Sequence, residues 1–170
     1  MTAADEVFGR SPGASTDDVA KLAGVGIATV FRHFPTKIEL LEAVLTLRLE
    51  RLRDRALELA EGDDPGTAFF GFFSQVVAES ASKLAIGEAL EAAGALAGPA
   101  VRQAGAGMRE AFDKLLTRAQ DSGAVRADAQ FDEVYALLIG ASRGATAVGL
   151  EPDVRDRMLS LIYDGLKPRS

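Results

Sequence analysis

The sequence predicts an all-α protein of about nine helices, with three in a small N-terminal head and the others in a helical body. Apolar residues recur every three or four positions along most of the chain, which is the period of amphipathic helices. Clusters of glycine and proline, at 61–66 and at Gly98-Pro99, separate the periodic segments. We find no repeat and no segment with the strict alternation of a half-buried strand.

The head is defined by helix-start patterns around a glycine turn. A short first helix is expected from Thr2 to Phe8, followed by a loop. Ser15–Asp18 has the form of a capping box, and Thr36–Glu39 repeats that pattern. Between them, Gly24 can end a helix in the left-handed conformation at little steric cost. This arrangement predicts a helix-turn-helix, a motif that presents its second helix to the DNA major groove.

The second helix of this motif is expected over Ile27–Phe34. It is barely two turns long, and isolated helices of that length are marginal in water. Neighbouring elements must therefore hold it in place, and we expect Val25, Val30 and Phe34 to lie in the core.

The body begins within a long helix, because the apolar period continues from Lys37 to Glu61 without glycine or proline. The other body helices are expected at 67–82, 83–97, 101–122, 128–149 and 151–166. In the first of these, four phenylalanines fall within five positions, at 69, 70, 72 and 73, and cannot share one helical face. That helix is therefore predicted to be buried on most sides or to line a cavity.

A run of small residues from Gly140 to Ala147 lies in the next-to-last helix. Two glycines inside a helix each cost about 1 kcal/mol relative to alanine. Close approach by a second helix would compensate for that cost. We therefore expect the last two helices to pair with their copies in a twofold dimer.

Four segments resemble the DNA-binding signature of TetR-type transcriptional regulators: Asp18–Ala20, Ala23–Val25, Thr29–Phe34 and Lys37–Leu41. The match is dense over about thirty residues and has no gaps. The resemblance implies a TetR-like architecture, with a DNA-binding domain over 1–46, its helix-turn-helix at about 15–34, and a ligand-binding and dimerisation domain over 47–170. The family usually has serine at Gly26 and tyrosine at Phe31, and its first helix is usually longer.

The resemblance also implies roles for individual residues at a double-stranded DNA operator. Ile27, Ala28 and Thr29 would face base edges, while His33 and Lys37 would contact the DNA backbone. Ile27 and Ala28 offer only apolar contacts, for instance to a thymine methyl group. Specificity would then depend on Arg32, Thr29 and DNA shape. The residues expected to contact DNA are Ser15, Ile27, Ala28, Thr29, Phe31, Arg32, His33 and Lys37.

In the body, the resemblance implies a cavity for a small-molecule effector of unknown identity and an interface between two copies of the chain. Apolar candidates for the cavity are Phe70, Phe73, Val77, Leu90, Met108 and Phe112. Polar candidates are Glu79, Glu88, Gln103 and Arg109. Candidates for the homodimer interface are Ala136, Gly140, Gly144, Ala147, Met158 and Ile162.

Composition limits the classes of function. The 170 residues are 48% hydrophobic and 26% charged, which suits a globular domain with a buried core. The absence of cysteine removes thiolate metal sites and disulfides, and no nucleotide loop or nucleophile motif is present. Neither an enzymatic activity nor a bound cofactor is therefore expected. No apolar run approaches the roughly 18 residues of a membrane span, so we expect a cytoplasmic protein without membrane contact.

The charge of the chain supports an alternative to operator binding. The formal net charge is −6, which opposes long-range attraction to nucleic acid. Residues 1–46 hold four basic side chains (Arg10, Lys21, Arg32, Lys37) and six acidic ones (Asp5, Glu6, Asp17, Asp18, Glu39, Glu42). The alternative is a dimeric protein of the same fold that binds a small molecule or a partner but binds DNA weakly.

Overall fold

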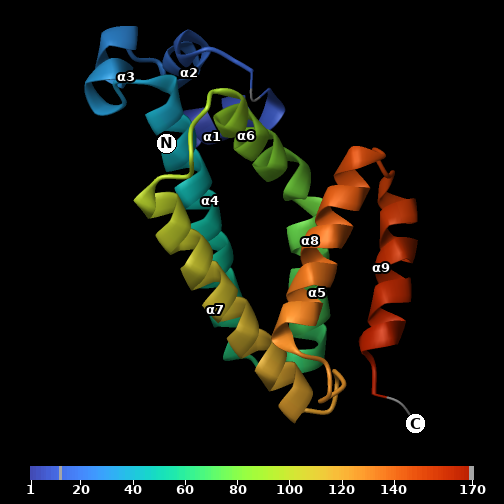
Figure 1. Cartoon of the computed structure of the whole chain (residues 1–170). Helices are drawn as coiled ribbons and strands as arrows, with labels where there is room; N and C mark the ends of the chain where they lie inside the picture. Colours follow the sequence, from blue (N-terminus) through green and yellow to red (C-terminus); the bar gives the residue numbers. More distant parts are fainter. Residues whose placement is uncertain (12, 169–170) are drawn as a thin grey trace. The chain divides into compact units, whose positions relative to one another are not determined.

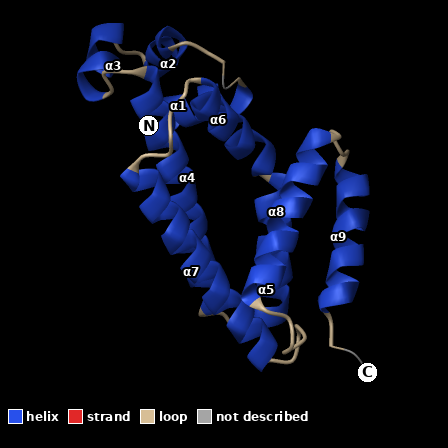
Figure 2. Cartoon of the chain, in the orientation of Figure 1, coloured by secondary structure: helices blue, strands red, loops and turns tan. Residues whose placement is uncertain are grey.

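The computed structural model describes residues 1–11 and 13–168, and this part of the chain contains nine helices and no strand (Figures 1 and 2). The predicted all-α fold is confirmed. The helices are α1 (Thr2–Arg10), α2 (Thr16–Ala23), α3 (Ile27–His33), α4 (Lys37–Ala60), α5 (Pro65–Ala78), α6 (Ser80–Ala92), α7 (Pro99–Asp121), α8 (Phe131–Ala147) and α9 (Pro152–Leu166).

Local sequence signals set several of these boundaries. The Ser15 hydroxyl accepts from the Asp18 amide and the Asp18 side chain accepts from the Ser15 amide, so the predicted capping box is present. Gly24 ends α2 with φ = 67°, in the left-handed region. At α5, the Asp64 carboxylate accepts from the Thr67 amide at 3.0 Å, and Pro65 occupies the first helical position.

The boundary between α5 and α6 differs from the expected one by several residues. The sequence predicts a single helix over 67–82, but α5 ends at Ala78 and α6 starts at Ser80. The Ser80 hydroxyl is buried and donates to the Val77 carbonyl at 2.8 Å, and it lies 3.2 Å from both the Ser142 carbonyl and the Thr146 hydroxyl of α8. Contacts with α8, which is distant in the sequence, thus determine the break between α5 and α6. Local helix propensity does not predict this break.

The chain forms two compact units. Unit 1 comprises 1–50 and 82–106, and unit 2 comprises 51–81 and 107–170. This grouping places most of α6 and the first part of α7 with the head, and the domain division at residue 46 stays a prediction. In Figure 1, α6 lies beside α1, and its residues Ile86 and Leu90 are buried in the core of unit 1.

The core of unit 1 is small and mostly aliphatic. Phe8 is its one fully buried aromatic side chain. Partly buried residues, including Phe34 and Ile38, pack against it. The buried members are Ala4, Phe8, Val19, Ala20, Val30, Leu40, Leu41, Val44, Ile86 and Leu90.

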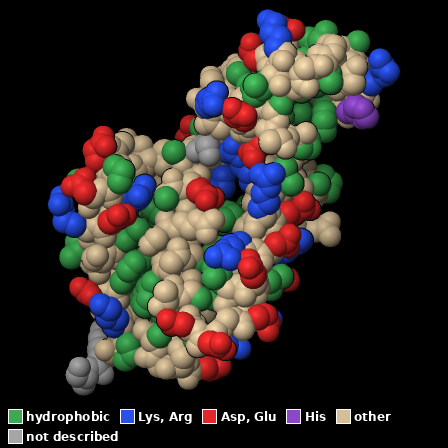
Figure 3. Space-filling model, turned by 180° about the vertical axis from the view of Figure 1, so that it is seen from behind, with side chains coloured by type: hydrophobic (Ala, Val, Ile, Leu, Met, Phe, Trp, Pro, Cys, Tyr) green, Lys and Arg blue, Asp and Glu red, His purple; other side chains and the backbone are tan. Residues whose placement is uncertain are grey.

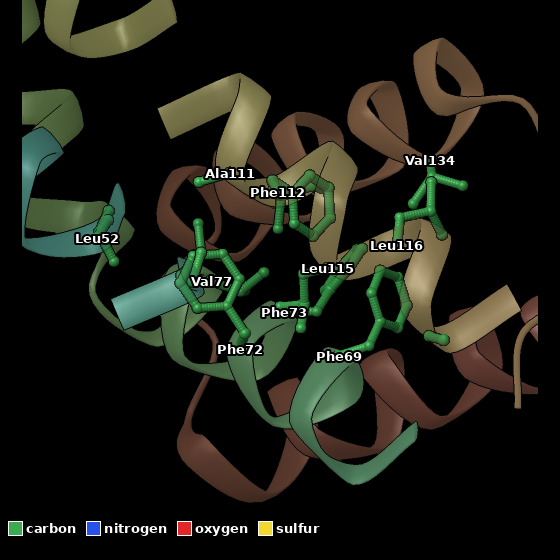
Figure 4. Packing of buried hydrophobic residues seen from close by; sticks show 14 of the residues in the cluster. Leu52, Phe69, Phe72, Phe73, Val77, Ala111, Phe112, Leu115, Leu116 and Val134 are labelled. Atoms are coloured by element: carbon green, nitrogen blue, oxygen red, sulfur yellow. The ribbon is translucent and has the colours of Figure 1, made fainter. Parts of the chain in front are cut away.

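The core of unit 2 is centred on aromatic rings of α5 and α7 (Figure 4). Phe69, Phe72, Phe73 and Phe112 are each 0% exposed. The Phe69 and Phe112 rings stack with centroids 5.7 Å apart. Phe70 points to another side of α5, where its ring lies 4.7 Å from that of Tyr163. The expectation that this helix is buried on most sides is confirmed.

Candidate DNA-binding surface

The seven-residue α3 is anchored to the head at its second half. Val30 is 8% exposed and belongs to the core of unit 1, and Phe34 packs against that core. The Phe34 amide donates to the Val30 carbonyl at 2.8 Å, which closes the helix. At the other end, Gly26 occupies the cap position without a side-chain hydrogen bond. A few tertiary contacts therefore hold a helix that would be marginal alone.

The opposite face of α3 is open to solvent. Ile27 is 40% exposed and Phe31 is 43% exposed, and Ala28 and Arg32 are exposed as well. These positions share one helical face because they are separated by one, three, four or five residues. Thr29 is half-buried beside this face. The chain's one histidine, His33, lies on the outer surface of the head beside hydrophobic side chains (Figure 3, purple).

Charges are separated within unit 1. Neither α3 nor the turn before it contains an acidic residue. Most of the acidic side chains counted in the head have partners on other faces. These pairs are Asp5 with Arg48, Glu6 with Arg10, Asp17 with Lys21, Asp18 with Ser15, and Glu42 with the Gly98 amide. The count of four basic and six acidic groups in residues 1–46 therefore gives too low an estimate of the attraction between α3 and a polyanion such as DNA.

Lys37 is held at the first turn of α4. Its Nζ donates to the Gly13 carbonyl at 3.1 Å and lies 5.8 Å from the centroid of the Phe8 ring. An ammonium group has three donors, so two remain for a phosphate. The position at a helix N-terminus adds a favourable field for an anion.

Ser15 is engaged within the protein. Its amide and its hydroxyl donate to Asp18 Oδ2 at 2.9 and 2.7 Å. The hydrogen bond from the Ser15 side chain, followed by that from its backbone, lowers the pKa of the Asp18 carboxyl. The structure thus gives Ser15 a capping role beside a carboxylate, and a phosphate contact would have to displace that bond.

The expectation that Val25 lies in the core is wrong. Val25 is 42% exposed and lines a hollow of about 230 Å³, which α1, α2 and α3 also border. Val25 follows the left-handed Gly24, so it belongs to the turn and to neither helical face. An apolar side chain in such a turn can remain partly solvated at little cost.

The residues expected around an effector fall into two separate cores. Phe73, Val77, Met108 and Phe112 are buried together in unit 2, with Phe70 packed beside them. Leu90 instead belongs to the core of unit 1. The polar candidates Glu79, Glu88, Gln103 and Arg109 are all exposed.

Arg109 has a structural environment of its own. Its guanidinium lies 4.7 Å from the ring centroids of both Phe131 and Tyr135, and it pairs with Asp132. This cluster is on the surface of unit 2. It uses the arginine to cover two half-buried rings.

A larger hollow of about 480 Å³ lies between α4 and α5 and is not predicted by the sequence. Gly71 borders it, and a Cβ at that position would meet no described atom within 4 Å. A glycine among four phenylalanines is the sequence signal that could have indicated it. The other lining residues are Arg55, Glu58, Leu59, Gly62, Asp64, Thr67, Ala68, Phe72 and Gln75.

The interface candidates on α8 form one open face. Ala136, Gly140, Gly144 and Ala147 are all exposed, and Cβ atoms at the two glycines would meet no described atom within 4 Å. No helix of the described chain therefore provides the close approach expected there. On α9, which lies beside α8 in Figure 1, Met158 and Ile162 are half-buried against the core of unit 2.

A three-helix head whose third helix, α3, has an exposed face and no acidic residue, joined to further helices, is typical of helix-turn-helix DNA-binding regulators. Residues 1–44 match the bacterial regulatory proteins of the tetR family, and residues 64–168 match the family described as "Transcriptional regulator SbtR-like, C-terminal domain". The chain belongs to the TetR family and is a DNA-binding transcriptional regulator.

Solved structures agree with this assignment. A TetR regulator from Mycobacterium vanbaalenii is 33% identical with a TM-score of 0.79, covering 98% of this chain and 91% of that one. A TetR regulator from Streptomyces coelicolor is 28% identical with a TM-score of 0.79, covering 99% and 97%. RolR, solved with resorcinol, shares the fold at 18% identity and a TM-score of 0.61, covering 99% and 85%. No curated protein gives a significant match.

One further property concerns membranes. Among the described residues, no helix is both long enough and apolar enough to cross a bilayer.

Proposed function

We infer that this regulator is a ligand-responsive repressor that binds a palindromic operator as a homodimer. One observation carries the inference. The face of α3 that a helix-turn-helix directs into the major groove is exposed and free of acidic side chains, with Arg32 on that face and Lys37 at the next helix start.

We assign DNA contacts to residues 1–46. Ile27, Ala28 and Thr29 would contact base edges, with Phe31 and Arg32 on the same face. His33 and Lys37 would contact phosphates. Ser15 would take part only if its hydroxyl released Asp18, so its contribution is expected to be smaller than that of Lys37.

The homodimer would form through α8 and α9. The open small-residue face of α8 favours close packing of a second helix, because glycine and alanine let backbones approach. On α9, Leu161 is 77% exposed and would be covered by the same partner. A twofold dimer places two copies of α3 on two half-sites, which is why a palindromic operator follows.

An effector would bind in the C-terminal domain, over 47–170. The SbtR-like match and a fold neighbour solved with resorcinol support a small-molecule response. The apolar lining would come from Phe70, Phe73, Val77, Met108 and Phe112, which share the core of unit 2. An effector that binds the DNA-free conformation more tightly would release the operator, because a ligand shifts only states that it binds unequally.

The test is DNA binding across a salt series. Fluorescence anisotropy with the DNA upstream of the gene should show sequence-selective binding that weakens as salt rises. Lys37→Ala should lower the slope of log affinity against log salt by about 0.9 for each phosphate that the lysine neutralises in the wild type. The matched control is Arg55→Ala in unit 2, where the side chain pairs with Glu58 and the slope should not change.

The same assay separates the alternative function. A small-molecule-binding protein with an impaired head would bind DNA weakly and without sequence preference. The engagement of Ser15 by Asp18 is the observation that favours this alternative. Selective binding by the wild-type protein would exclude it, and sequence-blind binding would contradict our proposal.

A further inference from the structure

We propose that the regulator recognises its operator largely through thymine C5-methyl groups, which Ile27 and Phe31 contact in the major groove. The inference rests on the proposed operator binding. It adds the chemical feature of the bases that the head would select.

The first observation is the exposure of two large apolar side chains on one face of α3. Ile27 and Phe31 are separated by one helical turn and keep 40% and 43% of their surface in solvent. Neither belongs to the core of unit 1, although the same helix buries Val30 there. The head thus positions one apolar face inward and a second one outward.

The second observation is the shortage of hydrogen-bonding groups on that outward face. Ala28 has none, and Thr29 is half-buried. Arg32 is the one arginine or lysine on α3. Bidentate recognition of guanine or adenine needs Arg, Lys, Asn or Gln, so polar readout by this helix is limited to few positions.

Base chemistry then identifies the complementary feature. The thymine C5-methyl group is the largest apolar feature that base pairs expose in the major groove. Covering that methyl group is therefore the base-edge contact from which an isoleucine or a phenylalanine side chain gains the most free energy. Phe31 has no hydroxyl, so its ring cannot donate to a phosphate in the way a tyrosine could.

The charges around this face fit DNA better than an apolar protein partner. Arg32 and His33 follow Phe31 directly, and Lys37 lies at the next helix start, where two of its three donors bond no residue that the structure describes. No acidic residue lies between Val25 and Thr36. An apolar centre with a basic border corresponds to base edges flanked by phosphates.

The experiment removes the methyl groups without changing base pairing. The upstream fragment is amplified with either dTTP or dUTP, and the affinity of the wild-type protein is measured for both. Each methyl group removed from the interface should weaken binding about fourfold, the change expected when one such group is no longer buried. One methyl contact per half-site would therefore give a decrease of about sixteenfold for a dimer.

Protein variants assign the effect to the two side chains. In Ile27→Ala the ratio of affinities for thymine and uracil DNA should fall about sixteenfold for one methyl contact per half-site, because the shortened side chain no longer reaches the methyl group in either subunit. Arg32→Ala should lower both affinities and leave the ratio unchanged. Phe31→Tyr should raise both affinities by adding a phosphate donor. Circular dichroism should show that Ile27→Ala folds like the wild type, because the side chain is exposed.

The outcomes are distinct. Selective binding with equal affinity for the two DNAs would overturn this inference and leave the proposed function standing. An equal decrease on uracil DNA in the wild type and in Ile27→Ala would also overturn it, because DNA deformability would then be the cause. Absence of selective binding to either DNA would reject both proposals together.

Discussion

Unit 2 is organised around four fully buried phenylalanines, whereas unit 1 has only Phe8 among smaller aliphatic residues. Specific polar contacts also join the helices of unit 1. Arg48 of α4 bonds both the carboxylate and the backbone carbonyl of Asp5 in α1. Glu42 of α4 accepts from the Gly98 amide at the start of α7 at 2.7 Å. Polar contacts of this kind have defined directions, and ring packing is less directional.

This difference corresponds to what each unit has to do. A DNA-reading head must present short helices with fixed orientation, yet three of its helices have fewer than ten residues. Directional bonds set those orientations where little apolar surface is available. The body can gain its stability from buried aromatic area, since each such side chain buries about 150–250 Å².

The largest effect on stability is expected from a substitution in the aromatic core of unit 2. Phe112→Ala should lower the free energy of unfolding by about 3–5 kcal/mol, because the ring is fully buried and a cavity would remain. Its ring contacts include Phe69, Phe72 and Phe73. Urea denaturation measures the change. Phe131→Ala, at a half-buried ring of the same cluster, should cost clearly less, and equal costs would contradict the ranking.

The next effect tests whether α6 belongs to the head. Ile86 is 0% exposed in the core of unit 1, so Ile86→Ala should cost about 2–5 kcal/mol. Hydrogen exchange should accelerate in α1, in residues 37–50 of α4 and in α6 more than in unit 2. Glu88→Ala, on the exposed side of α6, is the control. If exchange accelerated mainly in unit 2, the grouping of α6 with the head would be incorrect.

The head illustrates what local sequence can predict. Ser15, Asp18 and Gly24 determine helix ends through contacts within four residues, so the start and end of α2 follow from the sequence. Ile27 and Phe31 are exposed, and their contact with DNA stays a prediction. The engagement of the Ser15 hydroxyl by Asp18 belongs to the same predicted capping box.

Other features depend on contacts between distant residues. Leu90 lies in a weakly periodic, alanine-rich helix, and periodicity does not reveal which core its apolar side faces. The break before Ser80 depends on α8, which is some sixty residues away. Arg109 is a polar cavity candidate in the sequence, but its position over Phe131 and Tyr135 is a tertiary contact that spacing does not encode.

A smaller effect is expected for the bond between Glu42 and Gly98. A Cβ at residue 98 would lie 2.8 Å from Glu42 Oε1 and 2.9 Å from Oε2. Gly98→Ala should therefore expel the carboxylate, and Glu42→Ala should leave the partly buried amide without its acceptor. Each change should cost about 1–3 kcal/mol. Glu42→Gln keeps an acceptor oxygen and should cost less.

The double variant distinguishes this bond from unrelated strain. In the Glu42→Ala background, Gly98→Ala should cost almost nothing more, because both changes act on the same hydrogen bond. The direction of the change in DNA affinity is a further test. Glu39→Ala removes an exposed negative charge and should strengthen DNA binding slightly, whereas Glu42→Ala should weaken it by loosening α4. If the costs of Glu42→Ala and Gly98→Ala in unfolding free energy were additive in the double variant, the hydrogen bond between these residues would contribute little.

The smallest effect concerns the capping box of α2. Ser15→Ala should cost about 1 kcal/mol at neutral pH, a typical value for removal of a helix cap. Hydrogen bonds from Ser15 lower the pKa of Asp18 below its usual 3.8, so the folded state favours the carboxylate. That contribution is complete above pH 3.8 and is lost as the pH falls through the lowered pKa.

The penalty of Ser15→Ala should therefore shrink as the solution is acidified from neutral pH to pH 3, which amide exchange in α2 can follow. Thr36→Ala provides the comparison. It removes a hydroxyl that accepts from the Glu39 amide at 3.1 Å, a bond between uncharged groups, so its penalty should change little. If the difference in stability between wild type and Ser15→Ala did not change with pH, the hydroxyl alone, without the Asp18 charge, would supply the whole effect of the cap.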